Sequence, residues 1–474
     1  MMTSLLGTQS ALNRVIRISL IYCRKAREVS KSNEETVVYE GVIKIAKREE
    51  FTMKKWYSLI DKVYRIENLT KAFKAVKSNK GAPGVDGETI ESFEANIEAN
   101  IVKLNRELIT DTYEPLPVRR TYIDKDDGSK RPLGIPTVRD RVVQQAVKNI
   151  LEPIFEPEFH PSSYGYRPKR SCQKAVAKAE RFMRKYGLEH VVDMDLSKCF
   201  DTLDHEIIIK AVNQKVSDGR ILNIIKKFLK SGVMENGARD ESDIGCPQGG
   251  VISPLLMNIY LDYFDKKMME KGIRIVRYAD DILIFAKSRA LAGEYKALAI
   301  NILEKDLKLE VNDTKTHMAD NSRGVAFLGF IIKGKWISIH PKRIERFKDK
   351  IRKLTQRNQG INIAEIVKRL NPIIRGWANY FRIANCKTLY EELYHWIKRR
   401  LRSKKMKEWK SYKSFHKTLR RRGYKGKFKK ISMTRWRNSN CTLIHMALPN
   451  IWFTELGLVN LSEIQVGILS NYYE

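Results

Sequence analysis

The chain has 474 residues, enough for two or three domains with cores of their own. It carries 89 Lys and Arg against 55 Asp and Glu, a formal net charge of +34. An anionic partner offsets such an excess, or the protein tolerates it as an aid to solubility, and nucleic acid is the first candidate partner. Acidic lipid is the alternative, but no apolar run approaches the ~20 residues of a membrane-spanning helix. We therefore expect a soluble protein with no membrane partner.

The six cysteines lie far apart, at positions 23, 172, 199, 246, 386 and 441, and form no Cys-x-x-Cys pair. This spacing suggests neither a disulfide framework nor a zinc ribbon. An apolar run at 18–23 is too short for the core of a signal peptide and is bracketed by Arg17 and Arg24. These features favour a cytoplasmic protein with reduced thiols.

The first part of the chain divides near residue 52. Residues 1–52 contain no motif that indicates a function, and Met53-Lys-Lys-Trp-Tyr-Ser58 is typical of a natural start. We interpret 1–52 as an N-terminal extension, either disordered or produced by a mis-assigned start. Residues 53–335 alternate short β-like runs with helical stretches, separated by Gly- and Pro-containing segments such as 81–84 and 245–250. The pattern predicts an α+β or α/β domain.

Two segments of this domain carry candidate catalytic carboxylates. The apolar residues of 191–196 predict a strand with Asp195 near its end, where a carboxylate is costly unless charge or hydrogen bonds compensate. The apolar runs 273–276 and 282–285 predict a hairpin with Asp280 and Asp281 at the reversal. Taken alone, an Asp-Asp turn is more often a solubilising loop than a metal site. If the strand lies beside the hairpin, Asp195 and Asp280 can hold two Mg²⁺ ions about 3.5 to 4 Å apart, as phosphoryl transfer requires.

The later part of the chain is basic and helical. Residues 341–440 contain 32 Lys and Arg against 6 Asp and Glu, a local net of +26 within the total of +34. Apolar stripes at 363–381 and 389–401 recur at helical spacing, with an interruption expected at Asn371-Pro372, and such stripes are usually bundle core. The polar faces carry basic residues such as Lys398, Arg399 and Arg400. We predict a basic helical domain at 336–440 and a short segment at 441–474 that is a candidate for DNA binding.

Several motifs together resemble a known family, the reverse transcriptase and maturase proteins that bacterial group II introns encode. Tyr278-Ala-Asp-Asp281 resembles the Tyr-x-Asp-Asp motif of the family's palm, and Asp195 with Phe200 five residues on resembles its first metal motif. Gly376-Trp-Ala-Asn-Tyr-Phe381 resembles the signature of its thumb, or X, domain. Further blocks occur in the family's order, at 80–87, 131–137, 164–171, 247–250, 253–256, 309–315 and 327–330.

The resemblance implies an α+β right-hand polymerase, with fingers and palm at 53–335 followed by an α-helical thumb at 336–440. It implies that Lys125 and Arg131 grip the incoming triphosphate, that Phe200 favours deoxynucleotides by crowding the sugar 2′ position, and that Gln248 lines the nucleotide pocket. The backbone carbonyl of Leu196 is implied as a further metal ligand. Asp281 is expected to bind metal less tightly than Asp280, because adjacent residues of a strand point to opposite faces.

In the basic domain, the resemblance implies contacts of Trp377 and the 398–400 cluster with RNA. The expected function is an RNA-directed DNA polymerase that also assists splicing and retrohoming of its intron, using two Mg²⁺ ions. The expected partners are group II intron RNA, a primer-template RNA/DNA duplex, dNTPs and target DNA, whereas the oligomeric state stays undefined. No counterpart of the family's endonuclease follows residue 440, so the class C type, which takes its primer from a nascent DNA strand, is expected.

Two other functions remain open on the sequence alone. One is an RNA-binding splicing cofactor without polymerase activity. The other is a group II-like reverse transcriptase used in phage defence, against which the thumb signature weighs.

Overall fold

We describe a computed structural model that defines residues 55–124, 128, 130–235, 238–240, 244–409, 411–427, 429–439 and 441–473. Contacts divide the chain into two units, residues 1–56 and 57–474, and every element named below belongs to the second. The predicted extension at 1–52 and Lys125 lie outside the described residues. Within the described residues, none of the helices is long and apolar enough to cross a membrane.

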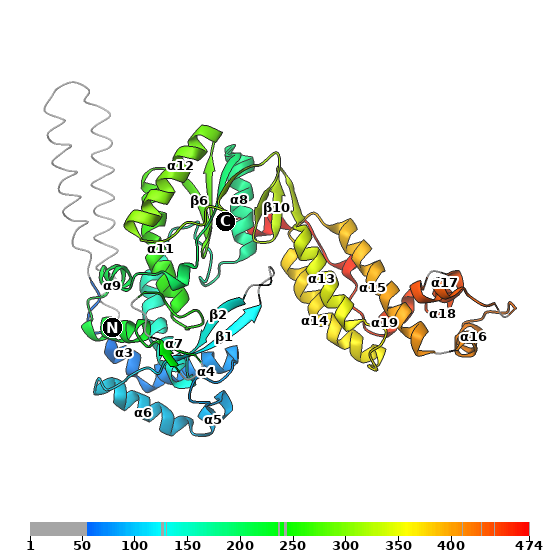
Figure 1. The fold of residues 1–474 in the computed structure, drawn as a ribbon, viewed down its shortest axis with the longest axis horizontal. Helices are drawn as coiled ribbons and strands as arrows, with labels where there is room; N and C mark the ends of the chain where they lie inside the picture. The colour runs from blue at the N-terminus through cyan, green and yellow to red at the C-terminus, as the bar shows by residue number, and fades with distance from the viewer. Residues whose placement is uncertain are drawn as a thin grey trace, which may run out of the picture. The chain divides into compact units, whose positions relative to one another are not determined.

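The predicted fingers combine a group of helices with a small mixed sheet (Figure 1). The helices are α3 (Ile60–Tyr64), α4 (Ile66–Asn79), α5 (Ile90–Ala95), α6 (Ile97–Ile109) and α7 (Val138–Phe155). The strands are β1 (Val118–Asp124), β2 (Lys130–Ile135), β4 (Val233–Glu235) and β5 (Ala238–Asp240), in the order β2-β1-β4-β5. The Thr137 side chain caps α7 by accepting a hydrogen bond from the Asp140 amide.

The predicted palm is a four-stranded antiparallel sheet in the order β6-β7-β3-β8. Its strands are β3 (His190–Asp195), β6 (Arg274–Tyr278), β7 (Asp281–Ala286) and β8 (His317–Asp320). Both faces of the sheet are covered, since Val192 and Ile284 belong to one hydrophobic core whereas Val191 and Phe285 belong to another. The predicted hairpin is confirmed by the antiparallel pairing of β6 with β7.

Helices from before and after the palm strands complete these two cores. They are α8 (Cys172–Tyr186), α9 (His205–Asn213), α10 (Gly219–Leu229), α11 (Ser253–Glu270) and α12 (Arg289–Asn301). Figure 1 shows α12 and α8 on either side of the sheet that contains β6. Helix α8 begins after Ser171, whose side chain accepts a hydrogen bond from the Lys174 amide, and ends at Gly187, which adopts the left-handed conformation.

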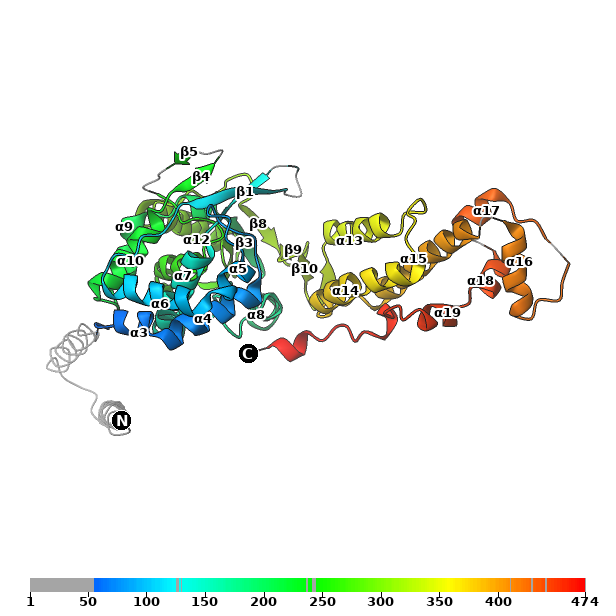
Figure 2. The same cartoon turned by 90° about the horizontal axis from the view of Figure 1, so that it is seen from below.

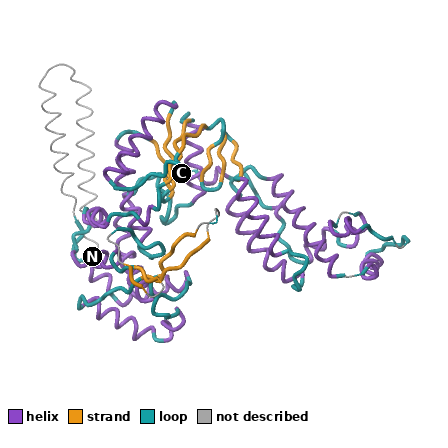
Figure 3. The backbone as a smooth tube through the Cα atoms, in the orientation of Figure 1, coloured by secondary structure: helices purple, strands orange, loops and turns teal. Residues whose placement is uncertain are grey.

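A small sheet separates the palm strands from the basic helices. It comprises β9 (Val325–Phe327), β10 (Phe330–Lys333) and β11 (Trp336–Ile339), in the order β11-β10-β9. The helices that follow are α13 (Pro341–Leu354), α14 (Ile363–Phe381), α15 (Lys387–Glu408), α16 (Tyr412–Arg421), α17 (Met433–Asn438), α18 (Thr442–Ala447) and α19 (Asn450–Glu455). Figure 3 shows strands concentrated before α13 and helices after it.

The expected interruption at Asn371-Pro372 was wrong, because α14 runs continuously through Pro372. A proline removes one backbone donor from a helix, but the surrounding contacts hold this one together. The Asn371 side chain donates to the Gly457 carbonyl at 2.8 Å and accepts from the Val459 amide at 3.0 Å. The dipeptide therefore joins α14 to the C-terminal segment.

The C-terminal segment runs back from α19 past the basic helices, as Figure 2 shows. Its Gly467 amide donates to the Ala384 carbonyl between α14 and α15. Near its end, the Tyr473 hydroxyl donates to the Glu180 carboxylate of α8 at 2.7 Å. The segment thus bonds both to the basic domain and to the palm, and the DNA contact expected of 441–474 stays a prediction.

Candidate active site

Three aspartates meet at one end of the palm sheet. The register of β3 and β7 places Asp195 directly opposite Asp281, so their side chains project from the same face. Asp280 lies in the two-residue turn of the hairpin, between the paired residues Tyr278 and Asp281. The structure therefore brings together all three carboxylates that the sequence singled out. It also gives Asp281, expected to be the weaker ligand, the direct pairing with Asp195.

Burial and, after it, mutual repulsion raise the pKa values of Asp280 and Asp281. Burial, together with the charges of Asp280, Asp195 and Asp193, raises the pKa of Asp281 to about 7. The pKa of Asp280 is also raised, mainly by burial and then by Asp195, whereas Arg131 and Lys315 act in the opposite direction. A bound divalent cation would relieve this repulsion, so the donor set fits a hard metal such as Mg²⁺.

Among the described residues, no group of three or more His, Cys, Asp or Glu side chains is arranged so that it could hold a metal ion. Magnesium sites of this kind use one or two protein carboxylates and take their remaining ligands from water and substrate phosphates. A pair of carboxylates at this end of the sheet is consistent with that chemistry.

The segment beyond Asp195 is held by an antiparallel bridge between Leu196 and Val311. Its hydrogen bonds come from the flanking residues, since Ser197 N donates to Glu310 O and Asn312 N donates to Asp195 O, each at 2.9 Å. The Leu196 carbonyl takes no part in these two bonds. This arrangement is compatible with the metal ligation predicted for that carbonyl.

Sequence reasoning missed two residues that contact Asp195. Lys315 Nζ lies 2.9 Å from Asp195 Oδ2, and Asn312 Nδ2 lies 3.4 Å from the same oxygen. Both belong to the 309–315 block, so the signal was present but no individual role was assigned. Lys315 forms an ion pair with Asp195 and, together with Arg131, partly balances the charge of Asp280.

The predicted nucleotide-pocket residues lie close to the aspartates. Phe200 is half-buried, and its ring meets that of Tyr166 edge-on with centroids 6.4 Å apart. The charges of Asp280 and Arg131 both influence the pKa of the Tyr166 hydroxyl, which is raised chiefly by burial. Arg131 is exposed on β2. Phe200 thus contacts Tyr166, and Arg131 and Asp280 lie near enough to the Tyr166 hydroxyl to influence its pKa.

Gln248 is fixed by two partners. Its side-chain amide donates to both carboxylate oxygens of Asp201 at 3.2 Å. Its backbone carbonyl accepts from the Gly134 amide at 2.6 Å. Gly249 packs so closely that a Cβ there would lie 2.3 Å from the Gly134 carbonyl oxygen. Asp201 is a third residue that sequence reasoning missed, although it follows Phe200 directly.

The predicted RNA contacts on the basic helices are not one continuous exposed patch. Lys398 is buried with its Nζ 4.2 Å from the centre of the Tyr394 ring, and burial lowers its pKa. Arg400 donates to the Thr355 hydroxyl at 2.6 Å. Arg399 is exposed. Of the three residues, Arg399 is the one best placed to contact RNA. The RNA contact of this cluster stays a prediction.

Trp377 lies at the wall of a pocket of about 760 Å³ between α13 and α14. Its ring stacks on Phe347 with centroids 4.3 Å apart, and its buried Nε1 has no hydrogen-bond partner among the described atoms. The α13 side of the pocket is basic, being lined by Arg343, Arg346, Lys350 and Lys353. An aromatic ring beside several cations is suited to nucleic acid.

Comparisons with known proteins agree with this arrangement. A profile described as reverse transcriptase (RNA-dependent DNA polymerase) matches residues 123–332, and one described as group II intron, maturase-specific domain matches residues 344–423. The fold and these matches define a reverse transcriptase joined to a maturase domain. The chain belongs to the family of group II intron-encoded reverse transcriptase and maturase proteins, which confirms the resemblance.

Two relatives illustrate the extent of the similarity. Protein YkfC of Escherichia coli K12 is 35% identical over 302 residues, which cover 56% of this chain and 79% of that protein. Group II intron-encoded protein LtrA of Lactococcus lactis is 36% identical over 288 residues, which cover 60% of this chain and 45% of LtrA. The matched region therefore spans less than half of the length of LtrA.

Solved structures give a weaker likeness. A telomerase from Candida albicans aligns with a TM-score of 0.38 and 13% identity, covering 67% of this chain and 63% of that one. A partial Cas6-RT-Cas1–Cas2 complex aligns with a TM-score of 0.35 and 22% identity, covering 52% of this chain and 43% of that one. The family assignment does not depend on these alignments.

Proposed function

We propose that this chain is an RNA-directed DNA polymerase that copies the RNA of its own group II intron and also binds that RNA to assist splicing. The observation that carries the proposal is the convergence of Asp195, Asp280 and Asp281 at one end of the palm sheet. Carboxylates that are buried this close together are costly to keep ionised without bound cations.

We propose that Asp195 and Asp280 hold two Mg²⁺ ions, with Asp281 and the Leu196 carbonyl as further ligands. When bound, the ions supply activation of the primer 3′-hydroxyl and stabilisation of the charge that develops on the leaving pyrophosphate. The chain's own residues position the substrates. Arg131 would pair with the triphosphate, and Lys125 is proposed for the same role.

The selection of deoxynucleotides is proposed to depend on Phe200. The edge-on contact with Tyr166 limits where the Phe200 ring can move. A ring held in this way would collide with a ribose 2′-hydroxyl and admit a deoxyribose. Gln248, which Asp201 and Gly134 hold in place, would line the opposite part of the pocket.

The maturase role is proposed for the basic helices. The excess of +26 within 341–440 matches a polyanionic partner, and the match to a maturase-specific domain covers 344–423. Reverse transcription of the intron at a DNA site, with target DNA and a nascent strand as primer, completes the proposed retrohoming cycle. The class C type is part of this proposal.

Primer extension on an RNA template with Mg²⁺ and dNTPs tests the proposal. Asp280→Asn should reduce the rate by about 10²-fold or more, because a carboxylate that binds a metal supplies several kcal/mol of transition-state stabilisation. Asp313→Asn is the matched control, since Asp313 is an exposed aspartate of the 309–315 block. It should extend primers as the wild type does.

Equal extension by wild type and Asp280→Asn would refute the catalytic assignment. RNA binding by a wild-type protein that extends no primer would instead support a splicing cofactor without polymerase activity. A filter-binding assay with intron RNA, run on the same preparations, separates these outcomes.

A further inference from the structure

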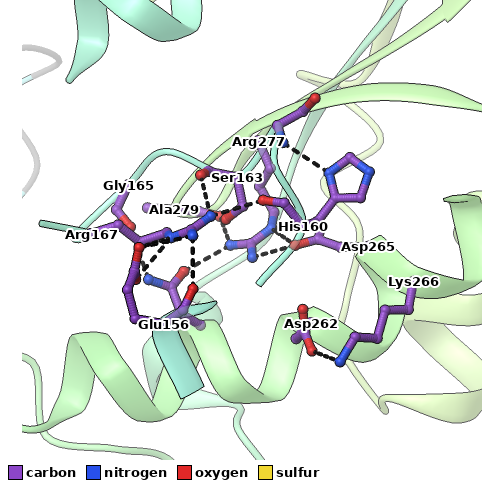
Figure 4. A network of polar contacts seen from close by, with 12 residues as sticks. Glu156, His160, Ser163, Gly165, Arg167, Asp262, Asp265, Lys266, Arg277 and Ala279 are labelled. Carbon is purple, nitrogen blue, oxygen red and sulfur yellow. Dashed lines mark hydrogen bonds and ion pairs between the residues drawn. The ribbon is translucent and has the colours of Figure 1, made fainter. Parts of the chain in front are cut away.

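Arg277, immediately before the Tyr-Ala-Asp-Asp motif, is a fully buried arginine that no proposed catalytic step uses. Its guanidinium pairs with Asp265 of α11, which is equally buried, through Nε to Oδ1 at 2.8 Å and Nη2 to Oδ2 at 2.6 Å. Its Nη1 donates to Asn258 Oδ1 of the same helix and to the Ala279 carbonyl, each at 3.1 Å (Figure 4). The arginine therefore connects α11 to the turn that carries Asp280.

The turn itself is strained and closely packed. Ala279 adopts a positive φ of 59°, which is unfavourable for a residue with a Cβ. Gly165 lies against it so tightly that a Cβ on the glycine would be 2.3 Å from the Ala279 nitrogen. Asn258 Nδ2 donates to the Gly165 carbonyl at 2.9 Å. Asn258 thus holds the glycine while Arg277 holds the alanine.

The loop that contains Gly165 is fixed by other bonds. The backbone of Arg277 forms a parallel β-bridge with that of Ser163, and the Tyr164 amide donates to the Arg277 carbonyl at 2.8 Å. A second buried arginine, Arg167, pairs with Glu156 and donates to the Ser163 carbonyl at 2.8 Å (Figure 4). Both sides of the turn therefore rest on rigid, hydrogen-bonded structure.

A buried ion pair is an inefficient way to stabilise a fold, because desolvation of the two charges offsets their attraction. The planar guanidinium of arginine, however, holds its hydrogen-bond partners in fixed directions. One of those partners here is the carbonyl of the peptide that joins Ala279 to Asp280. We propose that Arg277 is a positioning residue. Held by Asp265 and Asn258, it orients the Ala279–Asp280 peptide and thereby sets the affinity of the aspartates for divalent cations.

This inference rests on the proposed function and names a residue that acts through Asp280. A lysine at position 277 keeps the charge but cannot make the forked contacts to Asp265, Asn258 and the Ala279 carbonyl at once. We therefore expect Arg277→Lys to weaken cation binding by about 10- to 100-fold, as loss of a supporting contact does at other metal sites.

The test measures the affinity of the full chain for Mn²⁺ by electron paramagnetic resonance, without primer or nucleotide. Asp262→Asn is the matched control, because Asp262 is also on α11 and pairs with Lys266 without contacting the turn (Figure 4). It should bind Mn²⁺ as the wild type does. In primer extension, Arg277→Lys should need a higher Mg²⁺ concentration for half-maximal activity, whereas Asp262→Asn should need the same concentration as the wild type.

If Arg277→Lys does not fold, Asn258→Ser decides the question, because it keeps the Arg277–Asp265 pair and removes one support of the turn. Wild-type Mn²⁺ affinity in a folded Arg277→Lys or Asn258→Ser variant would overturn the inference. Failure of the wild type itself to bind Mn²⁺ in an Asp280-dependent manner would overturn the proposed function as well.

Discussion

Asp195 and Asp281 are direct partners in the antiparallel ladder between β3 and β7, so two carboxylates from distant parts of the chain face each other on one side of the palm sheet. Asp280 adds a third carboxylate in the adjoining turn. Arg131 and Lys315 partly balance the charge of Asp280. The proposed cation binding and catalysis at this position are therefore linked to the stability of the fold.

The first prediction concerns the stability of the metal-free protein. The folded pKa of Asp281, about 7, lies above the ordinary value for aspartate of about 3.9, so the folded state binds more protons between these pH values. The contribution of Asp281 therefore destabilises the fold increasingly as pH rises from about 4 through about 7. Asp281→Asn should raise the thermal midpoint at pH 8 in EDTA by a few degrees and have less effect at pH 5.

In the presence of Mg²⁺ the wild type should instead have the higher thermal midpoint at pH 8. Mg²⁺ stabilises the wild type by binding its folded state, and it finds a poorer site in Asp281→Asn. Differential scanning calorimetry at both pH values, with and without Mg²⁺, measures these differences. A lower midpoint of Asp281→Asn in EDTA at pH 8 would contradict the account.

The second prediction concerns sugar selection. Phe200→Ala removes the ring that packs edge-on against Tyr166 and opens space at the proposed 2′ position. The ratio of kcat/KM for dNTP to that for the matching NTP should fall by at least about tenfold, mostly through faster ribonucleotide insertion. Single-nucleotide extension measures both values. An unchanged ratio would show that another group excludes the 2′-hydroxyl.

The third prediction separates two neighbouring arginines of α15. Arg399 is exposed, so Arg399→Gln should lower the slope of log K against log salt for intron RNA by about 1 and leave the thermal midpoint unchanged. Arg400→Gln loses the bond to Thr355 and should lower the thermal midpoint by a few degrees. Equal salt slopes for wild type and Arg399→Gln would place this residue away from the RNA.

The fourth prediction concerns Lys315, whose Nζ lies 2.9 Å from Asp195 Oδ2. Its positive charge competes with a divalent cation for the carboxylate, so Lys315→Gln should tighten Mn²⁺ binding by a few-fold in the absence of nucleotide. The ammonium group is exposed, so the ion pair itself contributes little to stability and the thermal midpoint should hardly change. Weaker Mn²⁺ binding by this variant would count against competition.

The hairpin that carries Asp280 and Asp281 could be predicted because β-branched runs flank it on both sides. The pairing of Asp195 with Asp281 could not, because strand register depends on packing between segments far apart in the sequence. Alternation along a strand suggested that Asp281 binds metal less tightly than Asp280, and this order of affinity stays a prediction. The two-residue turn begins the strand at Asp281 and aligns that residue with Asp195.

The basic face of α15 shows a different limit. Helical spacing identified Leu393 and Ile397 as core positions, and both are buried. It could not show that the polar face is also covered, because the covering segments lie far from α15 in the sequence, some before it and some after it. Arg402, for example, donates to the Leu448 carbonyl at 2.9 Å and is itself buried. A polar stripe on a helix thus predicts exposure only where no other segment of the chain packs on it.

The most direct test of the account is a crystal structure of the protein with an RNA template, a DNA primer, a non-hydrolysable dNTP and Mn²⁺, read from the anomalous signal of the metal. We predict two Mn²⁺ peaks about 3.5 to 4 Å apart, both in contact with Asp195 and Asp280. Peaks remote from these aspartates, or an ordered dNTP with no metal between it and the carboxylates, would contradict the account.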